Sequence, residues 1–508
     1  MKLLMTLQDI SSWIKAAAPG AQLTSDSRRV QRGDVFFAYA GATRFIDAAI
    51  KLGAAAIVHD EADFAPGMDA AVPHLAVPDL KRQAGPIAHA FYGMPDQAMF
   101  SAGVTGTNGK TSCALWLAQA LARLGETSSV IGTLGVGLCK ARGEIDFDVT
   151  GYTTPDAVLL ARKLAVLREA GAQAVAIEVS SIGLDQERAA GMHFDVAMFT
   201  NLTRDHLDYH GDMAAYEAAK VKLFDWPGLK TAVINLDDAM GLRLAAHVAG
   251  KPAGQYPVIG YTLQDAASVP DLPGVLMLRA SQFRSRNAGT DFQLDCVLGT
   301  APVKTRLVGH FNISNALAVL GALLAHGTPL RAALDAIEAL QPAPGRMQQV
   351  GGQEAPMIVI DYAHTPDALE KTLLALRQVA QERSGQLWCV FGCGGDRDPG
   401  KRPQMGAIAQ LADHVLVTSD NPRSEDPHVI IGQIMAGMRA DGPQPQAIED
   451  RAAAILSAIK HAAKPDVILL AGKGHEPYQE IKGKKLPFSD ADHAQLALSA
   501  RLTMMRTN

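Results

Sequence analysis

The amino-acid sequence predicts an α/β protein with three domains, the second and third of which contain mainly parallel sheets. With 508 residues, 48% of them hydrophobic, the chain can bury roughly three cores of ordinary size. From about residue 98 onward, short apolar runs alternate with helical patterns, an order typical of a parallel sheet covered by helices. A stretch rich in Pro and Gly at residues 341–346 indicates a linker. We therefore expect domains at residues 1–96, 97–340 and 341–508.

The first domain is expected to be small and of the α/β type, because its apolar runs at 35–38 and 55–58 are broken by Gly and Asp. In the second domain we expect strands at 98–104, 174–179, 196–199 and 231–234, and helices at 111–124 and about 312–326. Alternation of the β type at about 250–308 is interpreted as a β-rich excursion of this domain. Strand patterns at 357–360, 387–391, 414–418 and 466–470 predict an open, Rossmann-like third domain.

Charge and composition exclude several classes of function. The formal net charge is −5, and acidic and basic residues are interspersed. The sequence therefore has no basic segment of the kind that binds nucleic acid or an anionic membrane. No signal-like segment and no run approaching roughly 18 apolar residues is present, so we expect a cytoplasmic chain without membrane insertion. The five Cys lack zinc or redox spacing and are expected to be reduced structural thiols. We expect a monomer.

The strongest local signal is a phosphate loop. The sequence GVTGTNGKTS lies between an apolar strand and an apolar-faced helix, and its first glycine stands one residue earlier than in the usual G-x-x-x-x-G-K-[ST] spacing. Backbone N–H groups and the helix N-terminus favour anionic oxygens there. Lys110 can reach the β- and γ-phosphates, and Thr111 can ligate Mg²⁺. We predict that ATP binds here through residues Gly106, Thr107, Asn108, Gly109, Lys110, Thr111 and Ser112.

Polar residues follow two other predicted strands. Glu178 comes after Ala-Val-Ala-Ile, and His206 stands in the segment TNLTRDHLDYH after Val-Ala-Met-Phe. Because ligands bind outside the carboxyl ends of parallel strands, both can converge on the phosphate loop. Each alone is more often structural, but their coincidence favours metal ligation.

The chain resembles the Mur ligases over essentially its whole length. The motifs that carry the resemblance are GVTGTNGKTS, EVSS, TNLTRDHLDYHG, YEAAK, GHFNISNALA, DYAHTPD, CGGDRDPGKRP, SDNPR and GKGHE, in the order of the family. The resemblance implies that Thr111, Glu178, His206 and Lys220 belong to Mg²⁺ sites, with Lys220 carboxylated by CO₂. A carbamate presents an anionic oxygen pair that a lysine lacks. From the sequence alone, Lys220 reads as a solvated helix lysine.

The resemblance also implies the site for the UDP-linked substrate. Ser27 is similar to the uridine-nucleotide contact, and the contacts to the muramoyl dipeptide correspond to Thr153, Thr154, Ser180, Gln186 and Arg188. The alternative for residues 153–155 is a helix N-cap with Pro155 at the first helical position, which is compatible with binding. Ile182 replaces the histidine frequent in this family after EVSS, so no role is carried over for it.

In the third domain, the resemblance is to the diaminopimelate-adding members. It implies that diaminopimelate contacts Arg397, Asp420, Asn421, Pro422, Arg423, Gly472 and Glu476. Arg423 decides the specificity, because its donor fork suits an additional carboxylate and lysine-adding relatives lack it. Taken alone, DNPR reads as an Asx-type turn.

Four further residues are expected to meet ATP at the seam between the second and third domains. They are Asn315, Arg346, Asp361 and His364, and closure of the domains would bring them to the nucleotide. The alternatives are a plain linker arginine for Arg346 and a helix-capping aspartate for Asp361.

The expected reaction is amide-bond formation through an acyl phosphate. The resemblance implies that ATP phosphorylates the D-glutamyl carboxylate of UDP-N-acetylmuramoyl-L-alanyl-D-glutamate, and that meso-diaminopimelate attacks the product, during peptidoglycan precursor synthesis. A lysine-adding relative is the nearest alternative. A P-loop kinase or NTPase leaves the Arg/Gly loops of the third domain unused, and a non-catalytic scaffold would have lost residues such as Lys110. A folylpolyglutamate synthase would not need about 95 residues before the phosphate loop.

Overall fold

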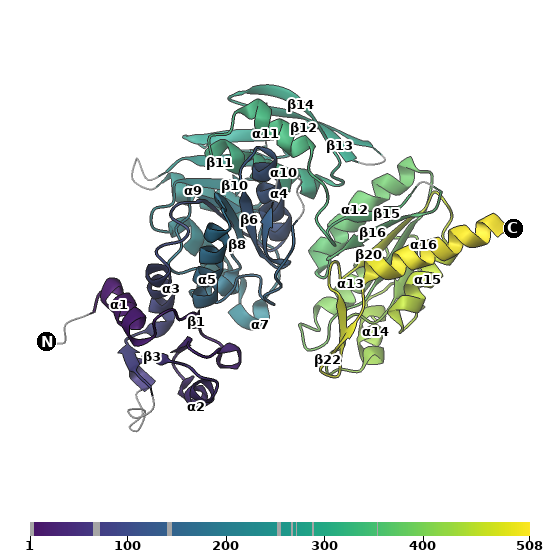
Figure 1. The fold of residues 1–508 in the computed structure, drawn as a ribbon. Helices are drawn as coiled ribbons and strands as arrows, with labels where there is room; N and C mark the ends of the chain where they lie inside the picture. Colours follow the sequence, from purple (N-terminus) through teal and green to yellow (C-terminus); the bar gives the residue numbers. More distant parts are fainter. Residues whose placement is uncertain are drawn as a thin grey trace.

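The computed structural model describes residues 5–63, 72–139, 145–250, 256–265, 268–270, 272–286, 289–352 and 354–507. Within these residues the strands form sheets of four, ten, six and two strands. Figure 1 shows the ten-stranded sheet in the middle of the chain, with the four-stranded sheet below it and the six-stranded sheet to one side. The predicted α/β class is confirmed.

The four-stranded sheet is parallel throughout and has the order β1-β2-β3-β4. Its core includes Ile14, Phe37 and Val58, because the apolar side chains of these short strands pack against the helices that flank them. The elements are α1 (Leu7–Ala17), β1 (Leu23–Thr24), η1 (Ser27–Arg29), β2 (Val35–Ala38), α2 (Ile46–Lys51), β3 (Ala56–Asp60), β4 (His74–Val77) and α3 (Leu80–Phe91).

The ten-stranded sheet is parallel from β12 through β11, β10, β9, β5 and β8 to β6, with antiparallel strands at both edges. The strands are β5 (Phe100–Thr105), β6 (Ser128–Gly132), β7 (Gly135–Cys139), β8 (Ala174–Glu178), β9 (Val196–Phe199), β10 (Thr231–Asn235), β11 (Val258–Thr262), β12 (Val275–Arg286), β13 (Gly289–Cys296) and β14 (Gly299–Thr305). The predicted β-rich excursion therefore extends this sheet, since β11 to β14 form its outer part.

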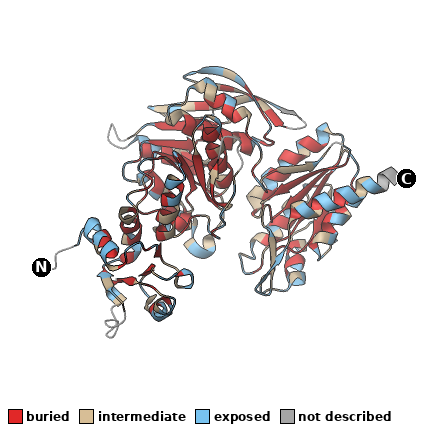
Figure 2. Ribbon diagram, in the orientation of Figure 1, coloured by how far each residue is buried: buried red, intermediate tan, exposed pale blue. Residues whose placement is uncertain are grey.

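Helices cover both faces of this sheet, and Figure 2 shows its strands buried between them. One face carries α4 (Lys110–Arg123), α10 (His310–Ala325) and α11 (Leu330–Glu338), whose apolar residues share one core. The other face packs α5 (Ala157–Glu169) and α9 (Ala239–Ala249) into a second core. Three short helices, α6 (Ser181–Asp185), α7 (Leu207–His210) and α8 (Met213–Val221), follow strand ends.

The six-stranded sheet has the order β15-β16-β20-β17-β18-β19, in which β15 alone is antiparallel to its neighbour. Its strands are β15 (Gln348–Gly351), β16 (Met357–Asp361), β17 (Leu387–Phe391), β18 (His414–Val417), β19 (Gln446–Ala447) and β20 (Val467–Ala471). The helices α12 (Pro366–Glu382), α13 (Lys401–Ala409) and α14 (Pro427–Met435) pack on one face, and α15 (Arg451–His461) and α16 (Asp490–Thr507) on the other. A hairpin of β21 (Tyr478–Ile481) and β22 (Lys484–Pro487) forms a separate two-stranded sheet.

No helix among the described residues combines the length and the apolar character needed to cross a bilayer. All five cysteines are free thiols, four of them buried.

A cluster of charged residues joins α3 to the central sheet. Asp96 accepts hydrogen bonds from His89 Nδ1 at 2.9 Å and His193 Nδ1 at 3.0 Å, and His193 Nε2 lies 3.3 Å from Asp195 Oδ2. The hydrogen bonds to Asp195 and to Asp96 raise the pKa of His193 to about 9. The charged imidazole of His193 therefore pairs with both Asp96 and Asp195 over the neutral pH range, and it links the segments that carry them.

We expect this cluster to make thermal stability depend on pH. Because the pKa of His193 rises from 6.5 to about 9 on folding, its contribution is complete below pH 6.5 and is lost as pH rises through about 9. Between these limits the melting temperature of the wild type should fall by roughly 2–6 °C more than that of His193→Gln. Differential scanning calorimetry across the range checks this, and equal pH slopes for the two proteins would contradict it.

Candidate functional site

The phosphate loop connects β5 to α4 at the carboxyl end of the central sheet. Gly106 has a φ of +149°, and a Cβ there would lie 1.9 Å from Thr200 Oγ1. Gly109 has a φ of +87°, and a Cβ there would lie 2.4 Å from Asn315 Oδ1. Glycine is thus required at both positions by conformation and by close approach.

The segment after β9 holds this loop in place. Thr200 Oγ1 donates to the carbonyl of Asn108 at 2.6 Å, and Asn201 Oδ1 accepts from the Asn108 N–H at 2.9 Å. Lys110 Nζ donates to the carbonyls of Gly106 and Thr107, both at 2.8 Å. The half-buried lysine folds back over its own loop, and desolvation there lowers its pKa.

Glu178 lies at the end of β8 and is 1% exposed. Its Oε2 accepts from Thr111 Oγ1 at 3.0 Å and from Thr133 Oγ1 at 3.2 Å, while Oε1 accepts from the Thr133 N–H at 2.8 Å. Thr133 Oγ1 also lies 3.1 Å from Thr153 Oγ1. One carboxylate therefore connects the phosphate loop with the segment predicted to bind the dipeptide.

Lys220 is buried, with 1% of its surface exposed, so the interpretation as a solvated helix lysine is wrong. Its Nζ lies 4.1 Å from the centre of the Tyr216 ring, whose hydroxyl is 3.0 Å from Thr107 Oγ1. The His206 ring lies 6.1 Å from the same tyrosine ring. Burial, and then the charge of Lys110, lower the pKa of Lys220 well below its usual value. Lys220 and His206 thus lie beside one aromatic ring, under the phosphate loop.

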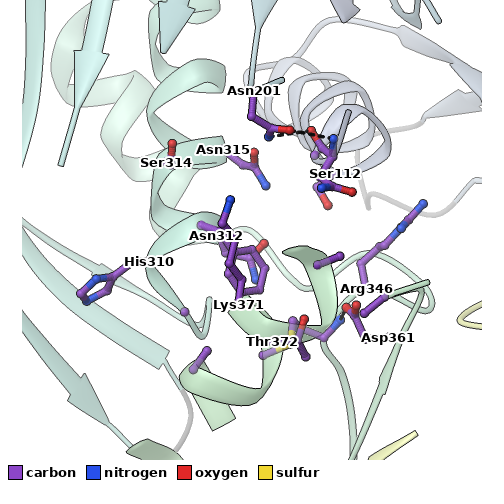
Figure 3. Close-up of a pocket in the computed structure, with 18 of the residues that line it drawn as sticks. Ser112, Asn201, His310, Asn312, Ser314, Asn315, Arg346, Asp361, Lys371 and Thr372 are labelled. Atoms are coloured by element: carbon purple, nitrogen blue, oxygen red, sulfur yellow. Dashed lines mark hydrogen bonds between the residues drawn. The ribbon is translucent and has the colours of Figure 1, made fainter. Parts of the chain in front are cut away.

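A cavity of about 520 Å³ lies at the seam between the central sheet and the last sheet (Figure 3). Seven of the residues predicted for ATP line it: Asn108, Gly109, Thr111, Ser112, Asn315, Arg346 and Asp361. Asn312 and Asn315 enter from α10, and Lys371 and Thr372 from α12. Gly106, Thr107 and Lys110 are not among its lining residues, and His364 lines a second cavity instead.

Arg346 reaches from the linker into this cavity. Its Nη2 donates to Thr111 Oγ1 at 3.2 Å, and its guanidinium lies 4.4 Å from the centre of the Tyr362 ring. Asp361 accepts from the Met347 N–H at 2.8 Å and caps no helix, since Thr365 is the N-cap of α12. The plain-linker reading of Arg346 and the capping reading of Asp361 are both wrong.

The second cavity, of about 410 Å³, shares the lining residue Tyr362 with the first. It brings together six of the residues predicted for diaminopimelate, without Pro422: Arg397, Asp420, Asn421, Arg423, Gly472 and Glu476. Arg204, Asp205 and His206 line it from the central segment, and His364 from the last one. Burial, then the charge of Lys401, lower the pKa of His364 to about 4, so its ring is neutral at pH 7.

The DNPR segment is held by the β21 hairpin rather than by its own turn. Asn421 Oδ1 accepts from the Glu480 N–H at 2.9 Å, and the Arg423 N–H donates to the Glu480 carbonyl at 3.0 Å. Arg423 has a φ of +51°, its Nη1 donates to the Gly395 carbonyl at 2.6 Å, and its Nε lies 3.4 Å from Glu480 Oε2. Long-range contacts therefore place the arginine at the cavity wall.

The residues predicted for the dipeptide also form one cluster. Thr154 Oγ1 donates to the Glu178 carbonyl at 2.9 Å and lies 3.1 Å from Ser180 Oγ. Arg188 donates to the Thr154 carbonyl at 3.0 Å and to Gln186 Oε1 at 2.7 Å.

The start of α5 corrects one alternative and ties this cluster to the first sheet. The helix begins at Ala157 with Asp156 as its N-cap, so the reading of Pro155 as its first residue is wrong. Asp156 also accepts from Ser25 Oγ at 2.6 Å and from the Tyr39 hydroxyl at 2.8 Å. Ser27 is half-buried at the start of η1, two residues from Ser25.

Comparison with known proteins agrees with this geometry. The Mur ligase middle domain matches residues 104–323, and the Mur ligase glutamate ligase domain matches residues 345–474. The chain is 59% identical over 508 residues to the UDP-N-acetylmuramoyl-L-alanyl-D-glutamate--2,6-diaminopimelate ligase of Janthinobacterium sp. (strain Marseille), covering 99% of both chains. The chain belongs to the Mur ligase family.

Solved structures of Mur ligases match nearly the whole length of this chain. A structure titled as a UDP-N-acetylmuramoyl-L-alanyl-D-glutamate--2,6-diaminopimelate ligase has a TM-score of 0.66 and 36% identity, covering 94% of this chain and 95% of that one. A MurF ligase from Thermotoga maritima in complex with ADP has a TM-score of 0.61 over 96% of this chain and 98% of that one. At 16% identity the latter shares the fold alone.

Several residues in or beside the two cavities of this Mur ligase escaped sequence reasoning. Thr133 follows β6 at the same sheet edge as Glu178, so its position at a strand end was an available signal. Lys473 lies inside the GKGHE motif, yet a lysine in a Gly-rich loop reads as exposed. For Lys371 and Phe311 no local pattern distinguishes a cavity wall from a helix surface.

Proposed function

We propose that this Mur ligase joins meso-2,6-diaminopimelate to UDP-N-acetylmuramoyl-L-alanyl-D-glutamate, with conversion of ATP to ADP and phosphate. The observation that carries the proposal is the pair of cavities that meet at Tyr362. The first is bordered by the phosphate loop, and the second is lined by three arginines, Arg204, Arg397 and Arg423, and by Glu476. This arrangement suits a nucleotide on one side and a zwitterionic amino acid with an additional carboxylate on the other.

The chemistry requires activation of the acceptor carboxylate. A carboxylate resists attack by an amine, so its oxygen first attacks the γ-phosphorus of ATP, and ADP leaves. Lys110 is the fixed positive charge of the loop that offsets the charge developing on the phosphate oxygens. The neutral amine of diaminopimelate then attacks the acyl carbon, phosphate leaves with the bonding electron pair, and the amine loses a proton to give the amide.

We assign the UDP-linked substrate to the dipeptide cluster and the first sheet. The cluster is connected to Glu178 through Thr154 and through Thr133, so a carboxylate bound there would lie close to the phosphate loop; its members are Thr153, Thr154, Ser180, Gln186 and Arg188. Ser27 is assigned to the uridine nucleotide, and the bonds from Ser25 and Tyr39 to Asp156 keep the two parts of this site together. The domain boundaries proposed with this assignment are 1–96, 97–340 and 341–508.

The residues near the loop fit Mg²⁺. Among the described residues no three His, Cys, Asp or Glu side chains gather to hold a metal ion, but the proposed donors include a hydroxyl and a modified lysine. Thr111 Oγ1 and Glu178 Oε2, 3.0 Å apart, are hard oxygen donors of the kind that Mg²⁺ prefers. Bound there, Mg²⁺ neutralises charge on phosphate oxygens.

Lys220 and His206 would supply the second set of donors. The lowered pKa favours the neutral Lys220 amine, which is the form whose nitrogen attacks CO₂ and releases a proton to give a carbamate. The carbamate adds an anionic oxygen pair in a buried position close to the positive charge of Lys110.

Contacts across the seam support closure around the reaction. Asn108 Nδ2 donates to Asp367 Oδ2 at 3.3 Å, and Arg204 Nη2 lies 3.9 Å from Asp398 Oδ2. Both contacts join the central segment to the last one, and closure of this seam would keep water away from the acyl phosphate. We further propose that the enzyme acts as a monomer in the cytoplasm, on small-molecule substrates and without nucleic-acid or membrane partners.

The direct test is release of ADP and phosphate with ATP, Mg²⁺ and the UDP-linked dipeptide, with meso-diaminopimelate or L-lysine added in parallel. We expect release, and a mass gain of the UDP product, with diaminopimelate. Preference for lysine would overturn only the assignment of diaminopimelate specificity to Arg423 and would leave the ligase proposal intact. Turnover indifferent to both amino acids would favour a P-loop NTPase and overturn the ligase proposal.

A further inference from the structure

Lys473 is an ammonium group buried behind the second cavity. Its side chain is 0% exposed, and it is not among the residues that line the cavity. Three cavity residues surround its Nζ: Asn421 Oδ1 at 3.1 Å, Glu476 Oε2 at 3.2 Å and Asp420 Oδ1 at 3.5 Å. A buried ammonium persists only when partners such as these offset the loss of hydration.

These contacts fix the orientation of the Asn421 amide. Asn421 Oδ1 accepts from Lys473 Nζ and from the Glu480 N–H at 2.9 Å, so both donors mark it as the oxygen. Its Nδ2 must therefore point the other way, and it donates to Glu476 Oε2 at 2.8 Å. Lys473 thus acts on Glu476 both directly and through the amide.

The two donors leave one oxygen of Glu476 for a ligand. Lys473 and Asn421 both contact Oε2, and within the described residues no hydrogen bond reaches Oε1. The Glu476 side chain is 18% exposed and lines the cavity that Arg423 also lines. A carboxylate with one oxygen anchored and the other presented suits an ammonium group, whereas Arg423 suits a carboxylate.

We propose that Lys473 is a positioning residue that sets the recognition of the distal ammonium group of the amino-acid substrate, by holding Glu476 so that Oε1 faces the cavity. This inference rests on the proposed function. The distal centre is the end of the amino acid that does not react. Arg423 would bind its carboxylate, and Glu476, held in place by Lys473, would bind its ammonium group.

The test compares two substrates that differ only at the distal ammonium. L-2-Aminopimelate keeps the reacting amine and the distal carboxylate of diaminopimelate but has hydrogen in place of the distal ammonium. In Lys473→Met, kcat/KM for diaminopimelate should fall roughly 10- to 100-fold, because a charged hydrogen-bonded network is broken. For L-2-aminopimelate it should fall by less than about 3-fold, and KM for ATP should stay unchanged.

Arg377→Met is the control. Arg377 is a half-buried cation of the last segment, and it pairs with Asp413 at 2.6 Å, away from the residues that line the cavity. Its loss should lower the melting temperature while leaving the ratio of the two kcat/KM values within about 2-fold of the wild type. A merely structural role for Lys473 would likewise leave that ratio unchanged and would overturn the inference.

Two further outcomes are decisive. If Lys473→Met is too unstable to purify, Lys473→Arg retains the charge, and it should recover most of the discrimination between the substrates if it folds. A loss on diaminopimelate in that variant that is as large and as selective as the loss expected for Lys473→Met would also overturn the inference, because the positive charge behind Glu476 is retained. Wild-type protein that accepts neither amino acid would instead overturn the proposed function, which keeps the two failures distinguishable.

Discussion

Replacement of Lys220 by alanine is expected to lower kcat by at least roughly 100-fold without unfolding the protein. The side chain is 1% exposed, and its lowered pKa favours the neutral amine that reacts with CO₂. Alanine removes the carbamate oxygens, and with them one proposed ligand of Mg²⁺. Steady-state ADP release measures the loss. In the wild type, ¹³C-labelled bicarbonate should give a carbamate carbon signal that the variant lacks.

The matched control is Lys222→Ala, which removes a lysine two positions away. Lys222 is exposed and pairs with Asp185 at 3.0 Å, away from the phosphate loop. Its replacement should change kcat by less than about 2-fold, as is usual for an exposed pair.

Short carboxylic acids added to Lys220→Ala should restore part of the activity. An alanine variant with wild-type kcat would exclude the carbamate from the mechanism.

Replacement of Arg423 by methionine is expected to reduce kcat/KM for diaminopimelate roughly 10²- to 10³-fold. The arginine lines the second cavity, and its position is set by the Gly395 carbonyl and by Glu480. Without it, the distal carboxylate is buried with no partner. Activity with L-lysine, which lacks that carboxylate, should be unchanged or higher. Parallel assays with the two amino acids measure the ratio.

Arg439→Met serves as the control for Arg423, because Arg439 is an exposed arginine of the same segment that pairs with Asp441 at 2.7 Å. The control should retain the preference of the wild type. If Arg423→Met kept its discrimination against lysine, the specificity would have to reside elsewhere in the cavity.

The strands were predictable because their apolar runs are short and sharply bounded. The expected strands at 196–199 and 387–391 have the bounds of β9 (Val196–Phe199) and β17 (Leu387–Phe391), both fully buried. The expected strand at 466–470 is shifted by one residue from β20 (Val467–Ala471), since the Asp466 side chain bonds Trp388 and the Gln386 N–H instead. The observed strand boundary thus differs from the expected one where a polar residue bonds with residues distant in the sequence.

The candidate site was predictable where a motif stands at a strand end, and less so where tertiary contacts decide. Glu178 was expected near the phosphate loop on the basis of sheet topology. The burial of Lys220 was not, because it depends on Tyr216 and on the loop above it, which helical periodicity does not reveal. The helix α5 begins at Ala157 rather than at Pro155 because Asp156 caps it, with a carboxylate that has three partners at once.

Tyr362 is the wall shared by two cavities of about 520 and 410 Å³. A single inhibitor could therefore carry one arm for each cavity, joined by a linker only as long as the path around one aromatic ring. Short linkage makes the second binding event intramolecular, so two weak arms give a tight ligand. The arm beside the phosphate loop would contribute affinity toward many nucleotide-using ligases, and the arm facing Arg423 would contribute selectivity for this one.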